Sequence, residues 1–569
     1  MTALLSVRDL RVEILTRAGP RRVVDDLSFD VAPGEVLALI GESGSGKSVA
    51  MQAITGLLPS PPAIATGGTA HFEGRDLLAM AETVRRRLRG DRIGIIFQEP
   101  MSALDPMMAV GDQIAETFVV HRGLSWRAAR AEAVRLLDRV RIPDAAARAK
   151  LHPAALSGGM RQRVVIAAAI ACKPALVIAD EPTTALDATV QAEILALLRE
   201  LRAEVGCAAI FITHDMAVVR QVADRVLVMR HGAEVESGTL EAVLSRPRAA
   251  YTRTLIAAAA PVEPRLRQVP AIAPAPLQID NLVVSFPHAG SMTSFRRQQR
   301  LFAVDGVSLK VGAGETVALV GESGSGKTTL ARAVLGLVQP ERGRIRLRGE
   351  EIGASGEPPG RRVQFVFQDP QSSLDPRFRA WQSVTEPLRI AGEATGLRER
   401  ALDLMLKVGL DASHLDRLTH ELSGGQRQRL GIARALSASP DLVIADEAVS
   451  ALDATTKLQV LELFERLQAE MGLPLLFITH DFAVVSRIAH RVAVMRFGRL
   501  VEMGPTASVL AAPRHAYTAA LIAAGGGRLG RGLASGRGHR IGALGSQRSQ
   551  RAMNEVAPGH FVAQDDDEG

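Results

Sequence analysis

Two octapeptides of almost the same sequence, one in each half of the chain, carry residue types suited to holding phosphate. GESGSGKS ends at Ser48, and GESGSGKT ends at Thr328. In a loop of the form G-x-x-x-x-G-K-[ST], the glycines let backbone N–H groups close around phosphate oxygens, the lysine reaches the outer phosphates, and the final hydroxyl ligates Mg²⁺. The residues predicted to bind nucleotide phosphate are Gly41, Glu42, Ser43, Gly44, Ser45, Gly46, Lys47 and Ser48 in the first half, and Gly321, Glu322, Ser323, Gly324, Ser325, Gly326, Lys327, Thr328 and Thr329 in the second.

Pairs of adjacent acids follow two identical apolar runs. LVIA precedes Asp180 and Glu181 in the first half, and the same run precedes Asp446 and Glu447 in the second. An aspartate at the end of a buried strand, beside a phosphate loop, is placed to hold Mg²⁺ through water. The glutamate that follows is placed to accept a proton from an attacking water molecule. The two pairs therefore predict a hydrolytic site in each half.

Glutamine and histidine also recur after apolar runs. Gln98 and Gln368 stand in the setting FQ[ED]P, where a glutamine is able to reach both metal and water, and His214 and His480 end the run FITH. We expect the histidines to contact the γ-phosphate, because phosphoryl transfer needs mainly positioned charge. The predicted catalytic residues are Glu181, Glu447, His214, His480, Gln98 and Gln368, and the predicted metal ligands are Ser48, Gln98, Asp180, Thr328, Gln368 and Asp446.

A second glycine-rich turn leads into a helix-forming run in each half. The two turns read LSGGMRQR and LSGGQRQR. A glycine-rich turn that opens a helix is another phosphate cradle. Each half already has a phosphate loop, so the extra cradle is expected to serve the nucleotide of the other half. Its residues are Ser157, Gly158 and Gly159 in the first copy, and Ser423, Gly424 and Gly425 in the second.

Strands and helices must bring these residues together. Residues 35–40 form a short apolar run that predicts a buried strand, and residues 48–58 predict a helix, so the first phosphate loop joins a strand to a helix. Five motifs recur in the same order in both halves, and the separation between the LSGG serine and the VIAD aspartate is the same in each. The chain is therefore predicted to contain two copies of one structural unit.

Two stretches lack the composition of a packed unit. Residues 261–276, PVEPRLRQVPAIAPAP, contain five prolines and predict a stiff, extended linker. Residues 525–569 begin GGGRLGRGLASGRGHR and predict a disordered tail. The predicted domains are therefore 1–260 and 277–524.

Taken together, the motifs resemble the ATPase domain of ABC transporters over both predicted domains. The resemblance implies an α/β fold with two tandem P-loop NTPase domains, each with a mixed-sheet ATP-binding core and a helical subdomain. It implies ATP and Mg²⁺ as cofactors and a head-to-tail pairing of the two domains within one chain. In that pairing Ser157, Gly158 and Gly159 would face the nucleotide on Lys327, Ser423, Gly424 and Gly425 would face the nucleotide on Lys47, and Asp187 and Asp453 would cross the interface.

In their detailed residues, the motifs resemble those of the ATPases of dipeptide, oligopeptide and nickel importers. GESGSGKS, FQEPM and FITHDMAVV have this form, and a Y-T-x-x-L segment occurs at 251–255 and at 517–521. Fused tandem members of the family import glutathione or microcin-type peptides. LSGGMRQR, DEAVSALD and the terminal PGHFVAQ are similar to the glutathione importers. The family implies two membrane permease subunits, an extracytoplasmic solute-binding protein, and a peripheral position on the cytoplasmic face of the inner membrane.

Two positions depart from the pattern of the family. Met160 replaces the usual Gln of LSGGQ, and Ala448 follows Glu447 where Pro182 follows Glu181. Neither change removes a catalytic group, so both sites are expected to hydrolyse ATP. Residues 15–28 contain no aromatic side chain that would stack on adenine, and aliphatic contact is expected there instead. In the second half Phe302 is a candidate for stacking.

Composition narrows the remaining function classes. The net charge is only +7 and the basic residues form no long run, so no nucleic-acid partner is predicted. Cys172 and Cys207 lack metal-binding spacing, and the C-terminal segment has no cysteine, so no iron–sulfur cluster is expected. No apolar run approaches the ~18 residues that span a bilayer, and no signal peptide is recognised. The alternatives are a soluble tandem ATPase acting on ribosomes or nucleic acid, and a regulator that binds nucleotide without hydrolysing it.

Overall fold

Two compact units make up the chain in a computed structural model. One is built mainly from Met1–Leu186 and Val190–Ala260, and the other mainly from Pro261–Leu452 and Thr456–Gly569. Across the ranges that the structure describes, no helix combines the length and the apolar character needed to span a bilayer. The described residues are 3–16, 19–183, 188–258, 267, 275–287, 300–352, 359–450, 452–524 and 553–563.

A six-stranded mixed sheet is the centre of the first unit. Its strands lie in the order β10 (Ala233–Thr239), β9 (Arg225–Arg230), β3 (Val36–Ile40), β8 (Ala208–Ile212), β7 (Leu176–Asp180) and β6 (Ile93–Ile96). All neighbouring pairs are parallel except β10 and β9. The inner strands β3 and β8 are apolar and buried throughout, as expected where a parallel sheet is covered on both faces.

A second, antiparallel sheet packs near the first phosphate loop. Its strands are β2 (Gly19–Val31), β1 (Leu5–Thr16), β4 (Ala63–Phe72) and β5 (Arg75–Asp76). Helix α1 (Lys47–Thr55) shares one core with both sheets, in which Ile54 is buried together with Leu10 and Leu39. The helix that follows the loop is therefore anchored on two sheets at once.

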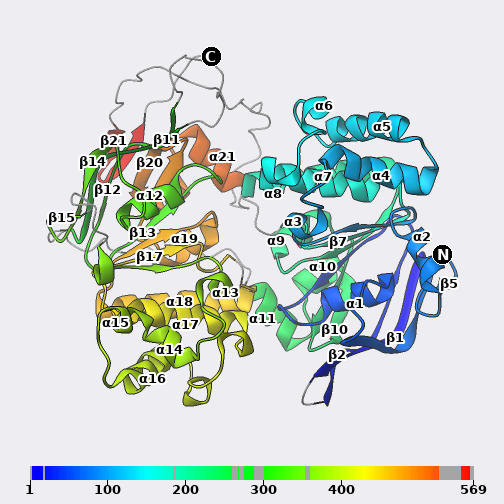
Figure 1. The fold of residues 1–569 in the computed structure, drawn as a ribbon, viewed down its shortest axis with the longest axis horizontal. Helices are drawn as coiled ribbons and strands as arrows, with labels where there is room; N and C mark the ends of the chain where they lie inside the picture. Colours follow the sequence, from blue (N-terminus) through cyan, green and yellow to red (C-terminus); the bar gives the residue numbers. More distant parts are fainter. Residues whose placement is uncertain are drawn as a thin grey trace. The chain divides into compact units, whose positions relative to one another are not determined.

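The other helices of the first unit cover the β6 side of the sheet and follow its later strands. Helices α4, α5 and α7 pack on one another, and α7 contacts β6, which makes a separate helical subdomain (Figure 1). The helices are α2 (Glu82–Leu88), α3 (Pro100–Ala103), α4 (Val110–Arg122), α5 (Trp126–Arg139), α6 (Ala145–Arg148), α7 (Gly158–Ile170), α8 (Ala188–Val205), α9 (Met216–Val222), α10 (Leu240–Ser245) and α11 (Ala250–Ala258).

The second unit repeats this architecture, with β13 (Thr316–Val320) at the centre of its main sheet. On one side of β13 lie β18 (Leu475–Ile478), β17 (Leu442–Asp446) and β16 (Val363–Val366), and on the other lie β19 (Arg491–Arg496) and β20 (Arg499–Pro505). The antiparallel sheet consists of β12 (Arg300–Val311), β11 (Leu277–Pro287), β14 (Arg342–Leu347) and β15 (Glu350–Ile352).

Helices of the second unit also gather in a subdomain beside β16. Helices α14, α16 and α17 pack on one another, and α17 contacts β16 (Figure 1). The α/β fold with a mixed-sheet core and a helical subdomain is thus confirmed in both units. The helices are α12 (Lys327–Val334), α13 (Pro370–Ser373), α14 (Ala380–Val384), α15 (Glu386–Ile390), α16 (Leu397–Lys407), α17 (Gly424–Ser437), α18 (Ala454–Met471), α19 (Phe482–Ile488), α20 (Thr506–Ala511) and α21 (Ala516–Ala524).

A C-terminal hairpin extends the main sheet of the second unit. Strands β21 (Met553–Ala557) and β22 (His560–Ala563) pair with each other, and β22 pairs antiparallel with β20. The prediction of a disordered tail over 525–569 is therefore wrong for residues 553–563. The physical reason is that this stretch pairs with β20, buries His560 and packs Met553 against the core of the second unit. The remainder of the tail, and most of the predicted linker 261–276, lie outside the described residues.

Candidate nucleotide-binding sites

The phosphate loop of the first unit wraps around its own lysine. β3 ends at Ile40 and α1 begins at Lys47, so the loop joins a strand to a helix. Lys47 is 5 % exposed, and its ammonium donates to the carbonyl oxygens of Gly41 and Glu42 at 2.9 and 2.8 Å. Burial lowers the pKa of Lys47. The loop thus holds a buried cation on its own carbonyl oxygens, which are the acceptors that a phosphate would replace.

The second unit builds the same loop. The Lys327 ammonium donates to the carbonyl oxygens of Gly321 and Glu322, both at 2.8 Å, and Lys327 is 6 % exposed. Gly326 has φ of 105°, and a Cβ at this position would lie 2.0 Å from the carbonyl oxygen of Ala303. Only glycine satisfies both conditions, because other residues rarely adopt this φ and would clash with the backbone of β12.

A hydroxyl and a carboxylate meet beside each loop. The Ser48 hydroxyl donates to a carboxylate oxygen of Asp180 at 2.9 Å, and the Thr328 hydroxyl donates to Asp446 at 3.2 Å. Burial raises the pKa of both aspartates. Oxygen donors of this kind are those that Mg²⁺ takes in phosphate sites, and a divalent cation would compensate the buried negative charge. The residues that are present therefore fit such an ion.

Three polar side chains of the first unit meet after the strands β6, β7 and β8. The two carboxylate oxygens of Glu181 contact different partners, His214 Nδ1 at 2.9 Å and the Gln98 amide nitrogen at 2.9 Å. These residues follow β7, β8 and β6, whose carboxyl ends lie at one edge of the sheet. The structure thus brings together in space side chains that stand far apart in the sequence.

The second unit repeats this cluster around Glu447. Its carboxylate contacts the Gln368 amide nitrogen at 2.7 Å and His480 Nδ1 at 3.3 Å. Burial alone would raise the pKa of Glu447, but the hydrogen bond and charge of His480 and the charge of Lys327 outweigh it and lower that pKa. Glu181 and Glu447 both have positive φ, at 45° and 47°. Strained backbone of this sort concentrates at functional sites, where the surrounding structure holds it in place.

The LSGG turns begin the long helices of the helical subdomains. The Ser157 hydroxyl caps α7 by accepting from the Met160 N–H, and Ser423 caps α17 in the same way with Gln426. Only the second copy adds the reciprocal bond, from the Ser423 N–H to the Gln426 side chain at 2.9 Å, whereas Met160 contacts Arg148. The replacement of glutamine by methionine therefore removes half of a capping box.

The third residue of each LSGG turn also has a packing role. A Cβ at Gly159 would lie 2.7 Å from a methyl of Val190 on α8, and a Cβ at Gly425 would lie 2.3 Å from a methyl of Thr456 on α18. These glycines let two helices approach closely, in addition to any contact with phosphate. The pairing of residues 157–159 and 423–425 with the nucleotide of the other half stays a prediction.

Asp187, Asp453 and Phe302 are the remaining residues that the sequence predicted at the site. Asp187 lies outside the described residues, and Asp453 directly precedes α18. Phe302 is 45 % exposed on β12 and is followed by Ala303, whose carbonyl oxygen lies against Gly326. The matching position before Val23 on β2 is Arg22, which forms an ion pair with Asp25. The two halves therefore differ in the side chain next to the phosphate loop.

Sequence reasoning missed a second contact to each phosphate loop. The Tyr251 hydroxyl accepts from the backbone N–H of Glu42 at 3.1 Å, and the Tyr517 hydroxyl accepts from the N–H of Glu322 at 3.0 Å. The signal was the repeated Y-T-x-x-L segment, but nothing in its spacing indicates which loop it would reach.

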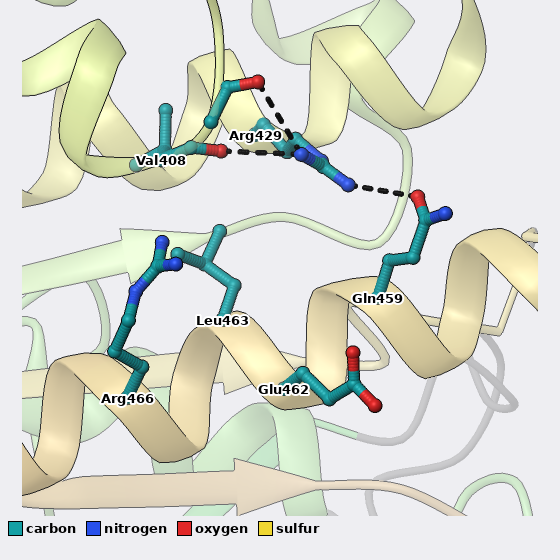
Figure 2. A pocket seen from close by; sticks show the side chains of 7 residues that line it. Val408, Arg429, Gln459, Glu462, Leu463 and Arg466 are labelled. Atoms are coloured by element: carbon teal, nitrogen blue, oxygen red, sulfur yellow. Dashed lines mark hydrogen bonds between the residues drawn. The ribbon is translucent and has the colours of Figure 1, made fainter.

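A cavity of about 190 Å³ in the second unit is lined by none of the predicted site residues. Figure 2 shows that Arg429 in this cavity donates to the Val408 carbonyl and, at 2.8 Å, to Gln459. Burial lowers the pKa of Arg429, and the charge of neighbouring Arg466 lowers it further. In the first unit the matching arginine, Arg163, instead forms an ion pair with Glu193. The cavity therefore marks a difference between the halves and is separate from the nucleotide site.

Family models match both halves of the chain. A model described as ABC transporter matches residues 24–184 and 304–450. A model described as the C-terminal region of oligopeptide/dipeptide transporters matches residues 235–284 and 501–525. The second pair of ranges includes Tyr251 and Tyr517, so the residues that contact the phosphate loops belong to this C-terminal region.

Curated relatives match nearly the whole chain. A glutathione import ATP-binding protein, GsiA, of Pectobacterium atrosepticum is 45 % identical over 91 % of this chain and 89 % of its own length. The GsiA protein of Escherichia coli K12 is 42 % identical over 98 % of this chain and 96 % of its own. The dimeric structure of MJ0796, a bacterial ABC transporter cassette, is 26 % identical over 42 % of this chain and 98 % of its own, with a TM-score of 0.38.

With two phosphate loops, two clusters of acid, histidine and glutamine, and relatives of this identity along most of its length, the chain belongs to the family of ABC transporter ATPases that carry the oligopeptide/dipeptide transporter C-terminal region.

Proposed function

We propose that this chain binds and hydrolyses ATP to drive an importer of glutathione or short peptides. The observation that carries the proposal is the doubled site, in which a buried lysine, a hydroxyl–aspartate pair and a glutamate held by histidine and glutamine lie together. The names of the relatives support glutathione as the solute. The match to the oligopeptide/dipeptide C-terminal region supports a short peptide as the alternative.

The roles of the chain's own residues follow from their contacts. In the first half Mg²⁺ would be held by Ser48 and Asp180, and when bound it would supply positive charge to the outer phosphates. Lys47 exchanges loop carbonyls for phosphate oxygens. Glu181 accepts the proton of the attacking water, while His214 and Gln98 hold its two carboxylate oxygens in one orientation.

The second half performs the same steps with its matching residues. Thr328 and Asp446 would hold the ion, and Glu447 would act as the base between His480 and Gln368. At neutral pH a glutamate is a carboxylate, which is the form that accepts a proton. Both sites are therefore proposed to hydrolyse ATP.

The wider assembly is part of the same proposal. Two ATPase domains, 1–260 and 277–524, are joined by the linker 261–276 and pair head to tail, so that residues 157–159 and 423–425 each serve the nucleotide of the other half. Fusion in one chain raises the effective concentration of one domain for the other. The pore would be formed by two permease subunits in the inner membrane, and this chain would lie on the cytoplasmic face of that membrane. An extracytoplasmic binding protein would deliver the solute.

Solute uptake tests the proposal most directly. Labelled glutathione and labelled dipeptides would be supplied in parallel to cells that lack this gene and to cells in which it is restored. We expect glutathione uptake to fall on deletion and to recover on restoration. A fall in dipeptide uptake alone would move the solute to the alternative, and no change in either would contradict import as the function.

A further inference from the structure

The two tyrosines of the chain occupy the same position in its two halves. Tyr251 lies in α11 and Tyr517 in α21, and the sequence contains no other tyrosine. Each hydroxyl accepts a hydrogen bond from the second residue of its phosphate loop, Glu42 or Glu322, across 209 and 195 residues of sequence. The same long-range contact thus forms twice within one chain, between a C-terminal helix and a loop far from it in sequence.

The peptide that each tyrosine contacts is the one that the loop lysine also holds. The carbonyl of the Gly41–Glu42 peptide accepts from Lys47, and the N–H of this same peptide donates to Tyr251. In the second half the Gly321–Glu322 peptide is held in the same manner by Lys327 and Tyr517. The first peptide of each loop is therefore fixed at both ends, once by the lysine and once by the tyrosine.

Each tyrosine is itself firmly placed. The guanidinium of Arg230 lies 4.7 Å from the centre of the Tyr251 ring, and that of Arg496 lies 4.7 Å from the Tyr517 ring. Burial raises the pKa of Tyr251, so its hydroxyl stays protonated at neutral pH. A cation over the ring and a neutral hydroxyl pointed at the loop make a defined contact.

The start of each tyrosine-bearing helix is anchored by a carboxylate on the preceding strand. Glu236 accepts from the backbone N–H groups of Arg248 and Ala249, at 2.8 and 3.0 Å, just ahead of α11. In the second half Glu502 on β20 accepts in the same way from the backbone N–H groups of Arg514 and His515, just ahead of α21. The tyrosines therefore connect the main sheet to the phosphate loops through helices that cannot easily shift.

We propose that Tyr251 and Tyr517 are positioning residues of the two phosphate loops, which keep the first loop peptide in place when the lysine leaves it for phosphate. The lysine must give up its loop carbonyls in order to serve a nucleotide, and the tyrosine hydroxyl then remains to hold that peptide. The C-terminal region of oligopeptide/dipeptide transporters thereby acts on the ATP site. The inference rests on ATP binding at these loops and not on the identity of the solute.

Substitution of each tyrosine by phenylalanine tests this role. Tyr251→Phe and Tyr517→Phe remove one hydroxyl each and keep the ring beneath its arginine. We expect the KM for ATP to rise about three- to tenfold in the double variant, the range given by one lost hydrogen bond at each site, with kcat and the melting temperature close to wild type. Thr254→Val is the matched control. This substitution also removes a hydroxyl from α11, but that hydroxyl donates to the Ala250 carbonyl oxygen of the same helix.

A spectroscopic measurement separates this role from general stability. Because the chain has two tyrosines, 3-fluorotyrosine gives two ¹⁹F signals, which the single phenylalanine variants assign. Addition of ATP to the full chain is expected to shift both signals. An unchanged KM together with unmoved signals in a wild-type protein that hydrolyses ATP would overturn the inference, whereas absence of ATP hydrolysis in the wild type would instead count against the proposed function.

Discussion

His560, at the start of β22, lies with its Nε2 atom 2.7 Å from a carboxylate oxygen of Glu502, and the two side chains are 4 % and 0 % exposed. Glu502 also accepts from the backbone N–H groups of Arg514 and His515, ahead of α21. Glu236 makes the corresponding contact ahead of α11. The C-terminal hairpin thus adds a buried histidine to the second-half anchor, at a place where the described part of the first half has no such hairpin strand beside β10.

Loss of this histidine is expected to release the hairpin. His560→Ala leaves a fully buried carboxylate without one of its partners, which costs about 1–3 kcal/mol. We expect the amides of 553–563 to lose protection in hydrogen–deuterium exchange and the second unit to unfold at lower temperature. His420→Ala is the control, since His420 is exposed. Equal protection in both variants would show that strand pairing with β20 holds the hairpin without the histidine.

The two glutamates that follow the VIAD strands are expected to control hydrolysis but not binding. Glu181→Gln with Glu447→Gln should lower ATP hydrolysis by about 10²–10⁴, the usual contribution of a general base. ATP binding should persist, because the lysines and glycines of both loops are unchanged. Phosphate release and equilibrium dialysis measure the two quantities. Glu193→Gln is a control, because Glu193 pairs with Arg163 outside the site. Unchanged hydrolysis with lost transport would assign these residues to coupling.

Phe302 is expected to stack on the adenine of the nucleotide held by the second loop. This expectation follows from the position of Phe302 beside Ala303, whose carbonyl oxygen lies against Gly326 of the phosphate loop. Phe302→Ala should weaken ATP binding at that site roughly tenfold, in line with the energy of one base stacked on an aromatic ring. Phe286→Ala, on β11 and 39 % exposed, is the control. Equal affinities in the two variants would exclude stacking on Phe302.

Most of the nucleotide site could be predicted because its residues stand in short, continuous sequence motifs. The loop around Lys47 follows from eight consecutive residues. Even the contact between Ser48 and Asp180, 132 residues apart, was within reach, since both residues follow apolar runs that form parallel strands of one sheet. The carboxyl ends of such strands meet at one edge, and polar residues placed there converge.

Contacts that depend on tertiary packing could not be read in this way. Residues 553–563 follow a glycine-rich stretch and gain their structure from the free edge of β20. Tyr251 reaches Glu42 only because α11 folds back onto the main sheet. Gly159 was expected as a phosphate ligand, yet its close approach to Val190 is a reason for glycine that no local pattern reveals.

A partly buried histidine, His490, makes the stability of the second unit depend on pH. Thr316 donates its backbone N–H to Nδ1 of His490 at 3.1 Å, and burial, reinforced by the charge of Arg267, lowers the pKa of His490 to about 4. The same group in the unfolded chain has a pKa of about 6.5. The unfolded state therefore binds more protons between these values, so this stability is present above about pH 6.5 and is lost as the pH falls towards 4.

Replacement of this histidine by asparagine is expected to remove the acid sensitivity. His490→Asn keeps an acceptor for the Thr316 N–H, in the way that Asp224 accepts from Val36 at 2.8 Å in the first half. Between pH 7 and pH 5 the wild type should lose about 2 kcal/mol of unfolding free energy through this one group. The loss in the variant over the same pH range should be smaller by this amount. Urea unfolding at the two pH values, followed by a probe in the second unit, measures the difference. Equal losses in wild type and variant would show that protonation of another group causes the acid sensitivity.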